Sequence, residues 1–271
     1  FNNIDEIWEK KIIDLILIGD SFVAGACTNK FNENNISDYF KKKNLNTINL
    51  GFPGHGPLLE YATFVEYAKS KKPKKLLWFY YEGNDMKGLN IEKKSQILKN
   101  YLNGKSYNLI NKQKEIETLL INNEYNLKDL EKFEKSKIFE NNFCNFKMQK
   151  IRKLINFTPS MLKNKKIDFL TDSNLKLFEK IIVNTKDSLN EWNGELIFVY
   201  LPELARYKKN FVNHDTYKKK KKIINLIKKN NIKIIDLHEE FFNKQKDPLI
   251  FFPLRTFGHY NLEGYERISK M

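Results

Sequence analysis

The chain of 271 residues is poor in cysteine and arginine and lacks a long hydrophobic run. Two cysteines cannot form the framework of a disulfide-rich protein. The absence of a run of about 18 apolar residues excludes a membrane-spanning helix in this sequence, and a mean hydropathy of −0.59 agrees. At 41% hydrophobic and 14% aromatic residues, the chain still has enough apolar side chains for a folded core and is not typical of disordered proteins.

Signatures of metal and cofactor binding are also missing. None of the four histidines lies four residues from another, and the two cysteines are far apart in the sequence. Neither a phosphate-binding G-x-x-x-x-G-K-S/T loop nor a dinucleotide-binding G-x-G-x-x-G motif occurs. We therefore expect no metal site and no cofactor.

Lysine is the residue that the chain has in excess. Lysine and arginine total 48 against 33 acidic residues, a formal net charge of +15, but only four of the 48 are arginine. Arginine pairs best with phosphates and guanine edges, so its scarcity argues against a nucleic-acid partner. The dense run Lys218 to Lys222 precedes an apolar helical pattern and is interpreted as the solvated start of a helix.

Short apolar runs alternate with helical patterns through most of the chain. Five runs have the length and the branched or aromatic content of buried parallel strands, at 12–18, 47–50, 75–81, 195–201 and 232–237. Helical spacing occurs between them and at the end, at 36–43, 58–69, 217–229 and 262–270. This alternation predicts an α/β protein with a parallel five-stranded sheet.

Residues 87–174 interrupt this alternation. They are rich in Lys, Asn and Glu, have helical periods without a clear strand, and far exceed the connection of roughly two to six residues that is usual in such folds. We predict a mainly helical insertion between two parts of one core, residues 1–86 and 175–271. Because it leaves the sheet where such sheets bind ligands, the insertion is a candidate lid; the alternative is an irregular low-complexity excursion.

A serine follows the first expected strand, in the motif Gly-Asp-Ser. Ser21 would present its hydroxyl and its N–H at the edge of the sheet, where an oxyanion could form. The G-x-S-x-G elbow of the α/β-hydrolases is disfavoured, because Val23 stands at its last position. The structural alternative is a helix cap made by Asp20 or Ser21.

Two further candidate motifs follow expected strands, and a third lies near the end of the chain. Gly51 and Gly54 follow the second strand and could expose backbone N–H groups to a ligand. Asn84 follows the third strand and could donate from its amide, unless it only forms a turn. His259 precedes the last expected helix and could act as a general base for Ser21.

Together and in this order, the motifs resemble the four blocks of the SGNH, or GDSL-type, hydrolase family. The resemblance covers the predicted core but not the insertion, and it implies a flavodoxin-like three-layer α/β/α sandwich. It implies a serine esterase with Ser21 as the nucleophile and His259 as the base. The N–H groups of Ser21 and Gly54 and the amide of Asn84 would hold the oxyanion, and an acyl-enzyme would form.

One position departs from the family pattern. The family usually places an aspartate three residues before the histidine, and Thr256 occupies that position here. Threonine cannot supply the negative charge that stabilises an imidazolium. A backbone carbonyl could orient His259 and leave a Ser–His dyad, or another carboxylate could do so, with Asp247, Asp236 and Glu82 as candidates. As a third alternative, the site has lost catalysis and only binds its ligand.

Residues beside these motifs are candidates for substrate binding: Asp20, Gly51, His55 and Arg255. The sequences Trp-Phe-Tyr-Tyr-Glu-Gly-Asn-Asp at 78–85 and Gly-His-Tyr-Asn-Leu-Glu-Gly-Tyr at 258–265 resemble a bacterial envelope-associated subgroup. Some of its members add or remove acyl groups on polysaccharides. The resemblance thus implies a small-molecule or carbohydrate ester as substrate, with an O-acyltransferase or a non-catalytic carbohydrate-binding module as alternatives.

The same subgroup implies a location. Its members often carry an N-terminal membrane anchor, and the cell envelope or periplasm is therefore the expected compartment. The present sequence starts at Phe1 without a signal-peptide pattern. An anchor would have to precede it.

Overall fold

The computed structural model describes residues 3–26, 35–122, 168–208 and 214–271. Contacts divide the chain into two compact units, of which one combines 1–110 with 170–271 and the other comprises 111–169. The sheet and every candidate site residue belong to the first unit.

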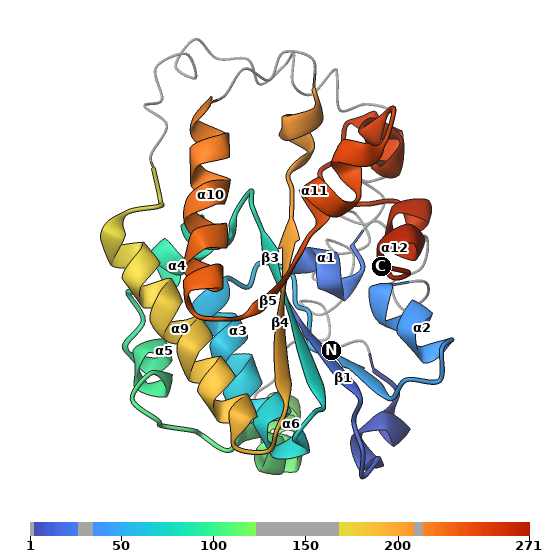
Figure 1. Ribbon diagram of the computed structural model, residues 1–271. Helices are drawn as coiled ribbons and strands as arrows, with labels where there is room; N and C mark the ends of the chain where they lie inside the picture. Colours follow the sequence, from blue (N-terminus) through green and yellow to red (C-terminus); the bar gives the residue numbers. More distant parts are fainter. Residues whose placement is uncertain (1–2, 27–34, 123–167, 209–213) are drawn as a thin grey trace. The chain divides into compact units, whose positions relative to one another are not determined.

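A parallel five-stranded sheet forms the centre of this unit (Figure 1). Its strands are β1 (Leu15–Ile18), β2 (Thr47–Asn49), β3 (Lys75–Tyr81), β4 (Glu195–Leu201) and β5 (Lys233–Asp236). They lie in the flavodoxin-like order β2-β1-β3-β4-β5, and all neighbours pair in parallel. Each strand lies within the run expected for it, so the predicted α/β fold is confirmed.

Helices cover both faces of the sheet (Figure 1). One layer contains α3 (Pro57–Thr63), α4 (Asp85–Glu92), α5 (Gln96–Tyr101), α9 (Asp172–Asn190) and α10 (His214–Lys229). The other contains α1 (Ser21–Ala24), α2 (Ile36–Lys41), α11 (Leu237–Glu240) and α12 (Leu262–Ile268). Because both faces are covered, β1 is buried along its whole length and β4 along all but its first residue.

Short helical turns complete the connections. The 3₁₀ turns are η1 (Asp5–Glu9), η3 (Lys69–Lys71), η4 (Leu109–Lys112), η6 (Leu204–Tyr207), η7 (Phe242–Lys244), η8 (Pro248–Phe251) and η9 (Pro253–Arg255). A π-helical segment, η2 (Phe64–Ala68), continues α3. Among the described residues, no helix combines the length and the apolar character needed to cross a membrane.

The expected insertion at 87–174 is described only at its two ends. Most of α4, then α5, η4 and α6 (Gln113–Asn122) form its first part, and α9 begins at Asp172. Residues 123–167 lie outside the described residues, so the lid stays a prediction.

The lysine run on α10 is not uniformly solvated, and this part of the sequence prediction is wrong. Lys220 is 6% exposed. Its Nζ lies 2.8 Å from Asp236 Oδ2 and 2.6 Å from Glu239 Oε1. Acidic residues at the end of β5 and in α11 therefore hold a buried lysine that the local pattern places in water.

Candidate active site

Ser21 and His259 are in direct contact where the strands end. Asp20 forms the N-cap of α1, because its Oδ1 accepts the Phe22 N–H at 3.0 Å. The Ser21 hydroxyl is therefore not needed as a cap. Its Oγ lies 2.7 Å from His259 Nε2, a contact between residues 238 positions apart in the sequence.

The imidazole of His259 is largely buried. Its ring packs against Phe22 with centroids 4.7 Å apart, and the next residue, Tyr260, is 1% exposed. Burial lowers the pKa of His259 from 6.5 to about 4, since a charged ring would be poorly solvated. The ring is neutral near pH 7, so a nitrogen can accept the proton of the Ser21 hydroxyl.

The sequence motifs predict two backbone oxyanion donors, the N–H groups of Ser21 and Gly54. As the first residue of α1, Ser21 has no intrahelical acceptor for its own N–H. Gly54 has a φ of +83°, which favours glycine, and a Cβ there would meet nothing within 4 Å. No hydrogen bond among the described residues uses the Gly54 N–H. The loop is tied to the end of β1, because Phe52 N–H donates to Gly19 C=O at 3.1 Å.

The Asn84 amide is linked to Ser21 through the carboxyl group of Asp20. Asn84 is the N-cap of α4, but its side chain makes no capping hydrogen bond. Its Nδ2 instead donates to Asp20 Oδ2 at 3.3 Å, and the Ser21 hydroxyl approaches the same oxygen at 3.4 Å. Asp20 thus joins the nucleophile candidate to the amide candidate, and burial raises the pKa of its carboxyl group.

The loop before His259 holds one of the proposed orienting acids. Asp247 Oδ2 accepts from Arg255 Nη2 at 2.6 Å on the protein surface. Leu254 and Arg255 have φ values of 50° and 57°, a left-handed backbone that is strained for such side chains. Thr256 follows them and is exposed. The ion pair therefore closes a strained loop.

The other two acids have partners on neighbouring elements. Asp236 is the N-cap of α11, accepting from His238 N–H, and it also pairs with Lys220. Glu82 forms a buried ion pair with Arg206, whose Nε lies 3.0 Å from Glu82 Oε2. Each of the three candidate acids is thus engaged by another group.

The remaining substrate-binding candidates differ in accessibility. Gly51 is buried, and a Cβ there would lie 2.5 Å from the Ala24 backbone nitrogen, so close packing on α1 requires a glycine. The His55 ring packs on Phe52 with centroids 4.8 Å apart, and Phe52 is 44% exposed. Burial lowers the pKa of His55 to about 4. An exposed aromatic ring therefore borders the Gly54 loop.

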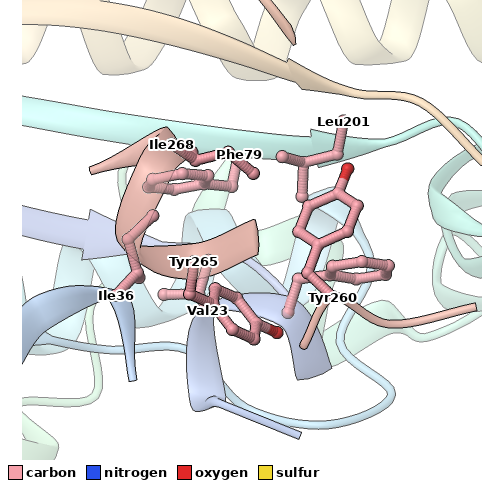
Figure 2. Close-up of a pocket in the computed structure, with 8 residues that line it drawn as sticks. Val23, Ile36, Phe79, Leu201, Tyr260, Tyr265 and Ile268 are labelled. Carbon is pink, nitrogen blue, oxygen red and sulfur yellow. The ribbon is translucent and has the colours of Figure 1, made fainter. Parts of the chain in front are cut away.

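A small apolar pocket lies behind α1 (Figure 2). Its lining comes from helices α1, α2 and α12 of one layer, from β3 and β4, and from the residue after His259: Phe22, Val23, Ile36, Phe79, Leu201, Tyr260, Tyr265 and Ile268. Phe22 and Tyr260 directly follow Ser21 and His259 in the sequence. The packing around the pocket therefore helps to fix the distance between the serine and the histidine.

Sequence reasoning missed most of a group of buried carboxyl groups beside the site. Asp20, Glu60, Asp85 and Glu92 are each at most 7% exposed. Burial raises the pKa of all four. Only Asp20 was singled out. The available signal was the spacing of Asp85 and Glu92, which places two acids on the same face of α4 as the buried Leu89. In the described part of the chain, no three His, Cys, Asp or Glu residues are placed to hold a metal ion.

No protein-family model and no curated protein sequence matches this chain. Solved structures are similar to it. One is a protein assigned to the lipolytic G-D-S-L family from Desulfitobacterium hafniense DCB-2, with 13% identity, a TM-score of 0.50 and 95% of each chain covered. Another is the lipase/acylhydrolase from Enterococcus faecalis, with 12% identity, a TM-score of 0.51, and 96% of this chain and 92% of that chain covered. The chain therefore has the α/β/α fold of these structures, as the resemblance implies.

Proposed function

We propose that the protein is a serine esterase of the SGNH type. The observation that carries the proposal is the 2.7 Å contact between Ser21 Oγ and His259 Nε2 at the carboxyl end of the sheet. Ser21 Oγ attacks the ester carbonyl while its proton passes to Nε2. Collapse of the tetrahedral intermediate expels the alcohol, which takes that proton, and leaves an acyl group on Ser21. Water, deprotonated by His259, then releases the acid and regenerates the serine.

Three donors would stabilise the oxyanion of both tetrahedral intermediates. They are the N–H groups of Ser21 and Gly54 and the side-chain amide of Asn84. The proposal is supported by the unused Gly54 N–H and by the contact of Asn84 with the carboxyl group that also touches Ser21. Neutral donors fixed before the reaction are worth more here than in water, because they need no reorganisation.

We further propose that none of Asp247, Asp236 and Glu82 orients His259. The support is that each of these carboxylates already forms an ion pair with an arginine or lysine side chain. Packing of the imidazole against Phe22 supplies orientation without a charge. The catalytic unit is then Ser21 with His259, in place of a triad with one of these acids.

The ester that we propose as substrate is an O-acylated carbohydrate. The exposed ring of Phe52, supported by His55 and bordering the Gly54 loop, offers a flat apolar surface to a sugar ring. Replacing Phe52 with Ala should raise KM for a peracetylated monosaccharide several-fold and leave that for p-nitrophenyl acetate unchanged. An equal effect on both esters would contradict a sugar-binding role.

The central test is hydrolysis of p-nitrophenyl acetate by the wild type and by Ser21→Ala. We expect the variant to lose at least about 10³-fold in kcat/KM. Ser95→Ala is the matched control, because Ser95 only caps α5 through Leu98 N–H. A fluorophosphonate should label the wild type at Ser21. Equal residual activity in wild type and Ser21→Ala, without labelling, would leave the non-catalytic binding module as the better interpretation.

The same acyl-enzyme could pass its acyl group to a sugar hydroxyl. Adding a sugar acceptor to the assay distinguishes the two outcomes, since transfer yields an acylated sugar and hydrolysis yields free acid. Free acid as the main product supports the esterase.

A further inference from the structure

We propose that Glu92 is a positioning residue for the oxyanion loop, defined as Gly54, His55 and Gly56. The proposal rests on the function proposed above, because it concerns the N–H group of Gly54. Glu92 lies at the end of α4, outside every motif that the sequence analysis singled out, and is 7% exposed.

One carboxylate takes the place of an N-cap for α3. Gly56 is the N-cap position and has no side chain to accept a hydrogen bond, and Pro57 has no N–H. Glu92 Oε1 accepts the Gly56 N–H at 2.6 Å. Its Oε2 accepts the N–H groups of Leu58 at 3.0 Å and Leu59 at 3.4 Å. The start of α3 and the end of the oxyanion loop are therefore bound to a single side chain.

Two glycines let this side chain reach the loop. A Cβ on Gly88 of α4 would lie 3.1 Å from Gly56 Cα. A Cβ on Gly56 would lie 2.9 Å from both carboxylate oxygens of Glu92. The two backbones thus approach as closely as glycine allows, and the loop has little room to move toward α4.

The direction of the Gly54 N–H depends on what holds the two ends of the loop. Gly54 has no side chain, and its surroundings leave open space around its Cα. On one side, Phe52 N–H is bound to Gly19 C=O at 3.1 Å. On the other side, Gly56 N–H is bound to Glu92. Loosening the Glu92 contact would let the N–H turn away from the developing oxyanion, which lowers kcat more than it affects substrate binding.

The chain offers a matched control at the far end of the same helical segment. Glu66, on η2, is a buried carboxylate that accepts Tyr107 N–H at 2.5 Å, Leu109 N–H at 2.7 Å and the Ser106 hydroxyl at 3.1 Å. It clamps a loop as Glu92 does, but that loop carries none of the proposed catalytic groups. A purely structural effect should be similar for the two glutamates.

The experiment compares Glu92→Gln with Glu66→Gln, using p-nitrophenyl acetate and phenylboronic acid, whose serine adduct places an oxygen among the oxyanion donors. Glutamine has only one terminal acceptor, so it cannot satisfy all three N–H groups. For Glu92→Gln we expect kcat to fall roughly 10- to 100-fold, KM to change less than about threefold, and the boronate to bind correspondingly more weakly. Glu66→Gln should keep kcat within about twofold at a similar loss of thermal stability.

Gly88→Ala provides a second variant that does not depend on the glutamate. Alanine favours the helix more than glycine does, but its Cβ would press on Gly56. We expect kcat to fall with an unchanged or raised melting temperature. Equal kcat in Glu92→Gln and Glu66→Gln, or an intact kcat in Gly88→Ala if Glu92→Gln does not fold, would overturn the proposal. Failure of the proposed function is a separate result, in which wild type and Ser21→Ala are equally inactive.

Discussion

Two groups of buried polar side chains lie at the carboxyl end of the sheet. On the side of β4 and β5, acids and bases are paired. Glu82 is bound to Arg206, with side chains 6% and 3% exposed, and Lys220 lies 2.8 Å from Asp236. Buried charges of this kind are tolerated because each has a counter-charge and hydrogen bonds.

On the side of β1 and β3, the buried acids have no counter-charge. No salt bridge within the described ranges joins Asp20, Glu60, Asp85 or Glu92 to a cation. Asp20, Asp85 and Glu92 accept backbone N–H groups instead, and burial raises the pKa of each. Perturbed and uncompensated groups cluster at functional sites more often than paired ones do. We call the first group the paired half and the second group, which lies beside the proposed catalytic residues, the unpaired half.

The most severe test of this comparison removes the base. His259→Ala should lower kcat/KM for p-nitrophenyl acetate by about 10³- to 10⁴-fold, because it removes the imidazole nitrogen that lies 2.7 Å from Ser21 Oγ and is the proposed acceptor of its proton. Its unfolding free energy should change far less than its activity. His238→Ala, on the paired side, is the control, and an equal loss of activity in both variants would contradict the distinction between the halves.

Breaking an ion pair on the side of β4 and β5 should reduce the stability of the protein more than its activity. Arg206→Met leaves Glu82 buried without its arginine, and we expect the unfolding free energy in urea to fall by about 3–5 kcal/mol. The folded variant should retain kcat within about threefold. Lys229→Met, in an exposed pair with Glu179, should cost less than about 1 kcal/mol. If Arg206→Met were stable but had a strongly reduced kcat, the Glu82–Arg206 pair would contribute to activity and not mainly to stability.

Removing the amide donor tests whether the unpaired half also binds the oxyanion. Asn84→Ala should lower kcat by about 10²- to 10³-fold with little change in KM, because a donor of this kind acts on the transition state. The side chain caps nothing on α4, so the helix should keep its stability. A loss that appeared in KM alone would assign Asn84 to substrate binding.

The acidity of His259 predicts the pH profile. The pKa is lowered to about 4, so the ring gains a proton only below that pH and then cannot act as a base. We expect kcat/KM to be flat from about pH 6 to 8 and to fall about tenfold per pH unit below pH 4. His55 also has a pKa of about 4, and His55→Gln should keep the acid limb if His259 causes it. A limb centred near pH 6.5 would show that the free enzyme does not bury this ring.

The smallest effect is expected at Asp247. Asp247→Asn removes the ion pair with exposed Arg255 and should change kcat/KM by less than about threefold. Arg255→Met, which removes the other partner of the same ion pair, should have a similarly small effect on kcat/KM. A loss of two orders of magnitude, confined to Asp247→Asn, would instead identify the acid that orients His259.

Ser21, Gly54 and Asn84 could be predicted as candidates because each lies within a few residues after a strand, and parallel strands bring their carboxyl ends to one edge. Glu92 could not be predicted in this way. Its spacing from Leu89 puts it on the buried face of α4, but its contact with the oxyanion loop depends on the close approach of Gly88 to Gly56. The burial of Lys220 could not be predicted for a similar reason, because its partners lie at the end of β5 and in α11 and not on its own helix.

The sequence by itself determined the strands, the helices around them and the residues at the strand ends, because these depend on local periodicity and on turn residues. Only the tertiary structure decided that Ser21 contacts His259 across 238 positions in the sequence. It also decided that Asp247, Asp236 and Glu82 each form an ion pair with a basic side chain. The tertiary structure likewise decided which carboxyl groups are buried without a basic partner. The physical reason is that pairing and desolvation depend on distances between segments far apart in the chain, and no local pattern encodes these distances.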